Sequence, residues 1–300
     1  MYIDFNKEVK TLVDIQQGNY KEALKLDIPE IDEHIRLKKG LTVILGHANV
    51  GKTSLVLFLM LCYSIRHKTK WLVYSSENEP FELIKKLCEN LLEEPLHKII
   101  PKDFTNALSF IKTHFLFMDN TKTYDYESLL EAAEETRIGF KYDGFFVDPY
   151  NSLVRSSKLK DLGAHEYDYE AATNFRIFCQ KFRISLWLCG HANTEAARQK
   201  YRDGHQYAGF PVVPSASSME SGSKWVNRSD QFLVVHRFIQ HPTEFMYSQL
   251  HCVKQKSIES GGRPTSLDYP IMLRALINNV GYSINNESVV KIIKNINAPF

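Results

Sequence analysis

The chain has 300 residues, 44% of them hydrophobic, which is enough to bury one large α/β core or at most two modest domains. Lysine and arginine number 37 against 35 acidic residues, so overall basicity cannot carry nucleic-acid binding, and any such surface must come from local clustering. No run approaches the roughly 18 apolar residues of a membrane span, the start lacks an apolar leader, and the cysteines form no CxxC pair, so we expect a soluble cytoplasmic protein with reduced thiols and no membrane contact.

The first 35 residues differ from the rest and predict an amino-terminal arm or linker, with a charged helical stretch over 6–25. From residue 36 to residue 300, β-rich runs alternate with amphipathic stretches of helical period. This alternation predicts an α/β domain, with a mainly parallel twisted sheet flanked by helices. The expected strands are 41–45, 71–75, 115–118, 144–148, 184–189, 231–236 and 248–253, and the expected helices include 53–67, 80–92, 126–136 and 170–182.

The first expected strand runs into Gly-His-Ala-Asn-Val-Gly-Lys-Thr, which matches the phosphate-binding pattern GxxxxGK[ST] between a strand and a helix. Backbone N–H groups of such a loop surround phosphates, Lys52 reaches the β- and γ-phosphates, and the Thr53 hydroxyl is a Mg²⁺ ligand. The pattern therefore predicts binding of ATP, or of another NTP or dNTP, together with Mg²⁺. The expected contact residues are Gly46, His47, Ala48, Asn49, Val50, Gly51, Lys52, Thr53 and Ser54.

Polar residues also follow three other expected strands, at the edge where parallel sheets bind ligands. Asp148 ends an apolar strand and is the second metal-ligand candidate, although it can also cap the turn at Pro149. Glu77 is the candidate for polarising the attacking water, with Glu79 as a rival, and either can instead begin a helix. His191 can contact the γ-phosphate and report hydrolysis to the long polar loop after it, or can be a structural histidine.

These residues, in this order, resemble the RecA-like ATPase domain of DnaB-type (superfamily 4) replicative helicases, and among them the Twinkle-like phage and mitochondrial enzymes. The resemblance covers roughly residues 26–282. It begins in "LDIPEIDEHIRLKKGLTVILGHANVGKTS" and continues through "VYSSENEP", "YDGFFVDPYNSL" and "FRISLWLCGHAN". It implies a RecA-like P-loop NTPase fold over residues 36–300, with Glu77 as the catalytic glutamate, Asp148 as the metal aspartate and His191 as the phosphate sensor.

The resemblance also implies a DNA-binding turn and a finger that acts on the neighbouring subunit's nucleotide. The turn is Glu220, Ser221 and Gly222, in "SMESGSKWVNRSDQFLVVHR", which without the resemblance is an ordinary serine-rich surface turn. Met219 stands where the family often carries Arg. The finger segment "LHCVKQKSIESGGRPTS" has Lys256 where the family commonly has Arg, so a lysine lacking the bidentate fork acts there, Arg263 replaces it, or hydrolysis is weak. Lys254 completes the set of finger candidates, and an edge of solvated lysines is the alternative.

The resemblance implies an NTP-driven DNA helicase motor that moves along single-stranded DNA as a homo-hexameric ring. Its other partners would be a primase or polymerase, in a bacterial or phage-infected host cytoplasm. Two alternatives share the nucleotide chemistry: a RecA/KaiC-like ATPase that acts in recombination or regulation without unwinding, and a degenerate ATP-binding accessory module.

Overall fold

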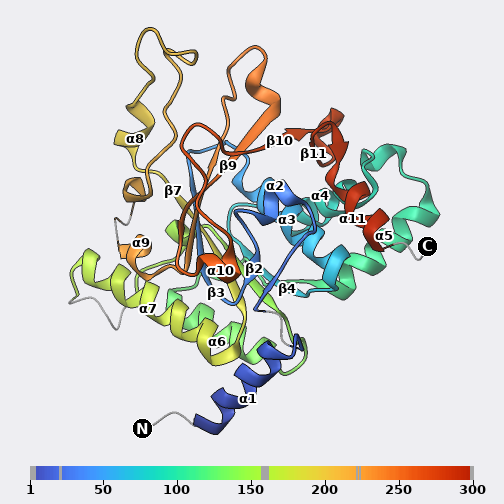
Figure 1. The fold of residues 1–300 in the computed structure, drawn as a ribbon, viewed down its shortest axis with the longest axis vertical. Helices are drawn as coiled ribbons and strands as arrows, with labels where there is room; N and C mark the ends of the chain where they lie inside the picture. Colours follow the sequence, from blue (N-terminus) through green and yellow to red (C-terminus); the bar gives the residue numbers. More distant parts are fainter. Residues whose placement is uncertain (1–4, 20–21, 157–161, 221, 223, 298–300) are drawn as a thin grey trace.

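One large sheet forms the centre of the chain in the computed structural model, which describes residues 5–19, 22–156, 162–220, 222 and 224–297 (Figure 1). Within these residues, ten strands form the sheet, and a further pair of short strands, β1 (Ala23–Leu24) and β2 (Leu37–Lys38), lies apart from it. The ten strands are β3 (Gly40–Gly46), β4 (Trp71–Ser75), β5 (Phe115–Phe117), β6 (Gly144–Asp148), β7 (Ser185–His191), β8 (Gln231–His236), β9 (Tyr247–Gln255), β10 (Ile271–Ala275), β11 (Tyr282–Ile284) and β12 (Glu287–Ser288).

The six strands β3 to β8 run parallel to one another, and the strands that follow β8 extend the sheet with antiparallel pairs. Its order is β12-β11-β10-β9-β8-β3-β7-β6-β4-β5. The pairs from β5 to β8 are parallel, and the pairs from β8 to β12 are antiparallel. This arrangement confirms the predicted α/β class with a mainly parallel sheet.

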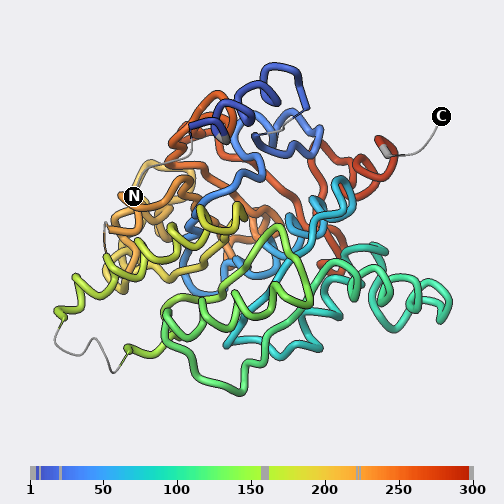
Figure 2. Tube along the Cα trace, turned by 90° about the horizontal axis from the view of Figure 1, so that it is seen from below, coloured from blue at the N-terminus to red at the C-terminus, as the bar shows by residue number. Residues whose placement is uncertain are grey.

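Helices cover both faces of the sheet. One face carries α3 (Lys52–His67), α4 (Pro80–Leu92), α5 (Pro101–His114) and α11 (Val289–Asn297), and the other carries α6 (Tyr126–Thr136), α7 (Ala164–Phe182) and α9 (Lys224–Arg228) (Figures 1 and 2). The shorter helical segments are α2 (Pro29–Asp32), α8 (Thr194–Arg198), α10 (Ile258–Gly261) and the 3-10 turns at Leu96–Lys98, Tyr150–Ser152, Ala216–Ser218, Glu244–Met246 and Ile277–Asn279.

Side-chain alternation along the strands separates two hydrophobic cores. In β4, Trp71 and Val73 point into the core beneath α3 and α4, whereas Leu72 and Tyr74 point into the core beneath α6 and α7. Strands buried on both faces are nearly continuous apolar runs, which explains why the sequence marks them so clearly. All five cysteines are buried free thiols.

The amino-terminal segment differs from the helix that we predicted over 6–25. Helix α1 spans only Phe5–Gln16, and Gly18 follows with a φ of 74°, a left-handed conformation in which a helix cannot continue. The chain then enters β1, which pairs antiparallel with β2. The helical prediction was therefore wrong beyond residue 16, because the Gly18 turn outweighed the helical period.

The second half of the predicted arm lies in the main core. Leu26, Ile28, Ile31 and Ile35 are almost completely buried against the residues of α3 and the sheet. The domain boundary at residue 35 stays a prediction, but this packing attaches the stretch 26–35 to the main hydrophobic core.

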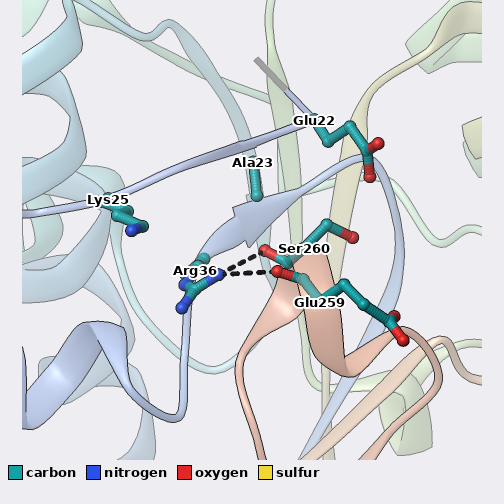
Figure 3. Close-up of a pocket in the computed structure, with 6 residues that line it drawn as sticks. All are labelled: Glu22, Ala23, Lys25, Arg36, Glu259 and Ser260. Carbon is teal, nitrogen blue, oxygen red and sulfur yellow. Dashed lines mark hydrogen bonds between the residues drawn. The ribbon is translucent and has the colours of Figure 1, made fainter. Parts of the chain in front are cut away.

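The side chain of Arg36 joins the end of this segment to helix α10 by hydrogen bonds to main-chain oxygens. Arg36 donates from Nη1 to the main-chain oxygens of Glu259 and Ser260, at 3.1 and 3.3 Å (Figure 3). Its Nε donates to the main-chain oxygen of Asp32. Arg36, Glu259 and Ser260 line a pocket of about 260 Å³ together with Lys25 (Figure 3). The pocket lies beside β1 and β2, so it belongs to the junction of arm and core.

No helix within the described residues is long and apolar enough to cross a membrane.

Candidate nucleotide-binding and catalytic site

The loop between β3 and α3 has the geometry of a phosphate-binding loop. Asn49 and Gly51 adopt positive φ values of 62° and 87°, so the backbone turns twice before α3 begins at Lys52. A Cβ added at Gly46 would lie 2.6 Å from the Val235 oxygen, so only glycine fits where β3 passes β8. Because α3 begins directly after the loop, its first N–H groups have no partner within the helix and can bind an anion held by the loop.

Lys52 lies at the centre of the loop. Its side chain is buried, and Nζ donates to the main-chain oxygens of Gly46 and His47, at 3.2 and 2.8 Å. Burial lowers the pKa of Lys52 from its ordinary value. The ammonium is thus positioned inside the loop, where β- and γ-phosphate oxygens can replace the two main-chain oxygens as its hydrogen-bond acceptors.

Thr53 and Asp148 lie together, as the metal prediction requires. The Thr53 hydroxyl donates to Asp148 Oδ2 at 2.6 Å, and Asp148 is only 1% exposed. Burial raises the pKa of Asp148, while hydrogen bonds from Thr53 and the Cys189 thiol oppose the rise. A hydroxyl and a carboxylate oxygen side by side are the hard ligands that suit Mg²⁺, so these two residues fit the predicted ion.

A chain of polar contacts links Lys52 to the other two candidates. Lys52 Nζ lies 3.4 Å from His191 Nδ1, and His191 Nε2 lies 3.2 Å from Glu77 Oε1. With Lys52 donating to Nδ1, Nε2 is the ring nitrogen that donates to the carboxylate. The ends of β3, β4 and β7 therefore bring three of the four predicted catalytic residues together, and the fourth, Lys256, lies elsewhere beside Asp230. Glu79, the rival of Glu77, is exposed at the start of α4 and has no hydrogen bond from its side chain to the helix.

Two polar residues at this edge were missed by the sequence reasoning. Arg237 directly follows β8, and its guanidinium lies 3.9 Å from the position that a Cβ at Gly51 would take. Asn151 lies three residues beyond Asp148, and its side chain hydrogen-bonds the main chain of His191. The signal that could have found both is their place just after the carboxyl ends of parallel strands, where ligand-facing residues gather.

No family model matches the chain. It is 29% identical over 151 residues to the “Probable plasmid replicative DNA helicase” of Chlamydia psittaci, a match that covers 47% of this chain and 32% of that protein. The chain thus spans about a third of the length of this relative.

Solved structures match over nearly the whole chain. The “ATPase Domain of G40P” superposes with a TM-score of 0.72, at 11% identity, and the match covers 96% of this chain and 100% of that one. A structure of a DnaB-like replicative helicase, described with its interactions with primase, gives a TM-score of 0.68 at 11% identity, covering 94% and 67%. The chain has the RecA-like fold of DnaB-like helicase ATPase domains. The fold expected from the resemblance is thereby confirmed.

The predicted DNA turn of this RecA-like domain lies next to the edge that carries the candidate catalytic residues. Glu220 donates its main-chain N–H to the His191 oxygen at 3.0 Å, and Gly222, with a φ of 82°, donates to the Met219 oxygen at 2.7 Å. Ser221 lies outside the described residues. Both described amides of the turn are therefore used within the domain, and its role in DNA binding stays a prediction.

The three finger candidates of the RecA-like domain lie at or near the opposite, amino edge of the sheet. Lys254 donates to the main-chain oxygens of Val226 and Ser229, at 2.5 and 2.7 Å, and so stabilises the end of α9. Burial lowers its pKa. Its ammonium is thus committed within the protomer.

The other two candidates form ion pairs. Lys256 is 52% exposed and lies 3.5 Å from Asp230, which also pairs with Arg176 at 3.4 Å. Arg263 pairs with Glu33 of the amino-terminal segment. Lys256 and Arg263 therefore remain the candidates whose charged ends reach the surface, while the role of any of the three in trans stays a prediction.

Proposed function

We propose that the chain is the NTP-driven motor domain of a replicative DNA helicase, which translocates on single-stranded DNA and unwinds duplexes. The observation that carries this proposal is the meeting of Lys52, Thr53, Glu77, Asp148 and His191 at one sheet edge of a DnaB-like fold. The replicative helicase that shares sequence with the chain supports it. The partners we propose are a homo-hexameric ring, single-stranded DNA and a primase or polymerase, in a bacterial or phage-infected cytoplasm.

The residues divide the chemistry of hydrolysis among themselves. We assign Glu77 to the attacking water, because its carboxylate is 50% exposed and is held toward the loop by His191. Lys52 and the amides of residues 46–54 bind the phosphates, and Thr53 and Asp148 would hold Mg²⁺. The ion, when bound, neutralises phosphate charge. Lys256 of an adjacent protomer, with Arg263 as the alternative, supplies positive charge to the γ-phosphate from outside.

His191 gives the site a means of responding to the γ-phosphate. Its ring contacts Lys52 and Glu77, both of which would gain phosphate or water as partners. Its main chain is bonded to the segment that leads to the DNA turn, since Ala192 forms a β-bridge with Met219. A movement of the His191 ring can therefore displace the turn through the end of the strand that carries His191.

Lys52→Ala tests the proposal. Removal of the ammonium should lower NTP hydrolysis by at least about 100-fold and abolish unwinding of a forked duplex, since one preorganised charge contributes several kcal/mol to phosphoryl transfer. Lys102→Ala, at an exposed position of α5, is the matched control and should behave as wild type. Retention of unwinding by Lys52→Ala would refute the motor assignment. Hydrolysis without any fork unwinding by the wild type would instead indicate the RecA/KaiC-like alternative.

A further inference from the structure

Three segments of the molecule converge on the side chain of Asn151. This residue lies in the 3-10 turn Tyr150–Ser152, directly after the strand that carries Asp148. Its Oδ1 accepts the main-chain N–H of His191 at 3.0 Å, and its Nδ2 donates to Glu220 Oε2 at 2.6 Å. Asn151 therefore touches the end of the sensor strand and the first residue of the predicted DNA turn at the same time.

The three residues close a ring of hydrogen bonds. The third bond joins Glu220 to His191, because the main-chain N–H of Glu220 donates to the His191 oxygen at 3.0 Å. Both main-chain polar groups of His191 are thus held, one by Asn151 and the other by Glu220. The His191 ring is free of this arrangement and faces Lys52 and Glu77 instead. The backbone of the sensor and the turn are consequently linked both directly and through the Asn151 side chain.

The chemistry of a carboxamide explains why asparagine is found there. The position needs an acceptor for the His191 N–H and a donor for the Glu220 carboxylate, and an amide offers them on two separate atoms of one short side chain. Aspartate would keep the acceptor but would place a second negative charge against Glu220. Alanine would remove both bonds.

We propose that Asn151 is a positioning residue that couples the nucleotide state sensed by His191 to the affinity of the Glu220 turn for single-stranded DNA. The inference rests on the proposed function. When the partners of the His191 ring change, its main chain shifts with it, and the amide transfers the shift to the Glu220 side chain. Without the amide, the turn keeps its main-chain links to this strand end, among them the Glu220 N–H bond and the bridge between Ala192 and Met219, but it loses the side-chain link and responds less.

The test reverses the polarity of the bond. Asn151→Asp should repel Glu220, whereas Asn151→Asp combined with Glu220→Gln restores a donor and an acceptor, now with the glutamine amide donating. For each protein we would measure the Kd of a fluorescein-labelled oligothymidylate with ADP and with a non-hydrolysable ATP analogue. The ratio of the two Kd values reports the coupling.

We expect Asn151→Asp to bring this ratio about fivefold closer to one than in the wild type, because a partly exposed charge-assisted hydrogen bond is lost. The double variant should regain most of the ratio. Glu220→Gln alone should change it less, since the asparagine amide can still donate to the glutamine oxygen. Asn106→Asp, an exposed position on α5, introduces the same charge away from the site and is the control.

Two results would overturn the inference. One is a wild-type ratio in Asn151→Asp, and the other is a lost ratio that the double variant does not recover, which would indicate a purely structural role. If either occurs while the wild type still unwinds forks, the proposed function stands and only the coupling role falls. If the wild type neither binds single-stranded DNA nor responds to it in hydrolysis, both fall together.

Discussion

Asp148 shows how the site sets function against stability at the scale of one residue. A carboxylate that is 1% exposed loses most of its hydration, and the Thr53 and Cys189 hydrogen bonds return only part of it. Burial consequently raises the pKa of Asp148. The folded domain binds a proton at this group more readily than the unfolded chain does, so the ionised carboxylate destabilises the fold until a cation shares the site.

Asp148→Asn should therefore stabilise the metal-free domain at neutral pH while abolishing Mg²⁺-dependent hydrolysis. The amide removes the buried charge and can still accept from Thr53, and we expect the Tm to rise by about 2 °C, as roughly 1 kcal/mol does in a domain of this size. Because the pKa of Asp148 is higher in the folded domain than in the unfolded chain, the two proteins should be equally stable below the pKa of aspartate in the unfolded chain, where Asp148 is protonated in both states. The stability advantage of Asp148→Asn should grow as pH rises through the pKa of Asp148 in the folded domain. Thermal melts in EDTA across pH measure this. A variant that is less stable than wild type at neutral pH contradicts the account.

At the scale of elements, prediction succeeded where local signals agreed. The strands Trp71–Ser75, Gly144–Asp148 and Gln231–His236 and the helices Pro80–Leu92 and Tyr126–Thr136 have the predicted bounds. Proline starts one of these helices, and the other begins with a capping box between Asp125 and Ser128. The stretch 6–25 failed because its helical period extended past a glycine turn into a two-residue strand.

The candidate site divides in the same way. The phosphate loop and the strand-end residues are read from spacing, since their chemistry lies within a few positions of a strand. The places of Asn151 and Arg237 after strand ends could have been read in this way too, but their contacts and the ion pair of Arg263 could not, because each contact depends on a partner far along the chain. Tertiary contacts of this kind decide which of several similar lysines is available to a neighbouring molecule.

Lys254 and Lys256, two residues apart at the end of β9, should consequently respond differently to substitution. Lys254→Met leaves the carbonyls at the end of α9 without their cation and should lower the free energy of unfolding by about 1–3 kcal/mol. Lys256→Gln removes a half-exposed ion pair, which contributes at most about 1 kcal/mol, but should reduce hydrolysis strongly. Urea unfolding and phosphate release measured on both variants separate the two roles. Equal loss of hydrolysis with no loss of stability in Lys254→Met would contradict this assignment.

At the scale of the whole molecule, the sheet separates the two halves of the proposed catalytic centre. Strand β3 runs from Gly40, beside Asp230 and Lys256, to Gly46 at the phosphate loop, and its seven residues span about 20 Å. A lysine side chain cannot cross that distance. If Lys256 acts on a γ-phosphate, it must be the γ-phosphate bound by another protomer, and hydrolysis then requires a head-to-tail assembly that closes into a ring.

Mixing two inactive variants tests this arrangement directly. Lys52→Ala chains retain the finger but lack the phosphate lysine, and Lys256→Gln chains retain the phosphate lysine but lack the finger. In equal mixtures about one quarter of the interfaces pair an intact loop with an intact finger, so hydrolysis should reappear at about that fraction of the wild-type rate. Mixing either variant with Lys52→Ala/Lys256→Gln chains is the control and should restore nothing. If the first mixture also stays inactive although native mass shows mixed rings, Lys256 does not act across the interface, and Arg263→Gln should then be mixed with Lys52→Ala in its place.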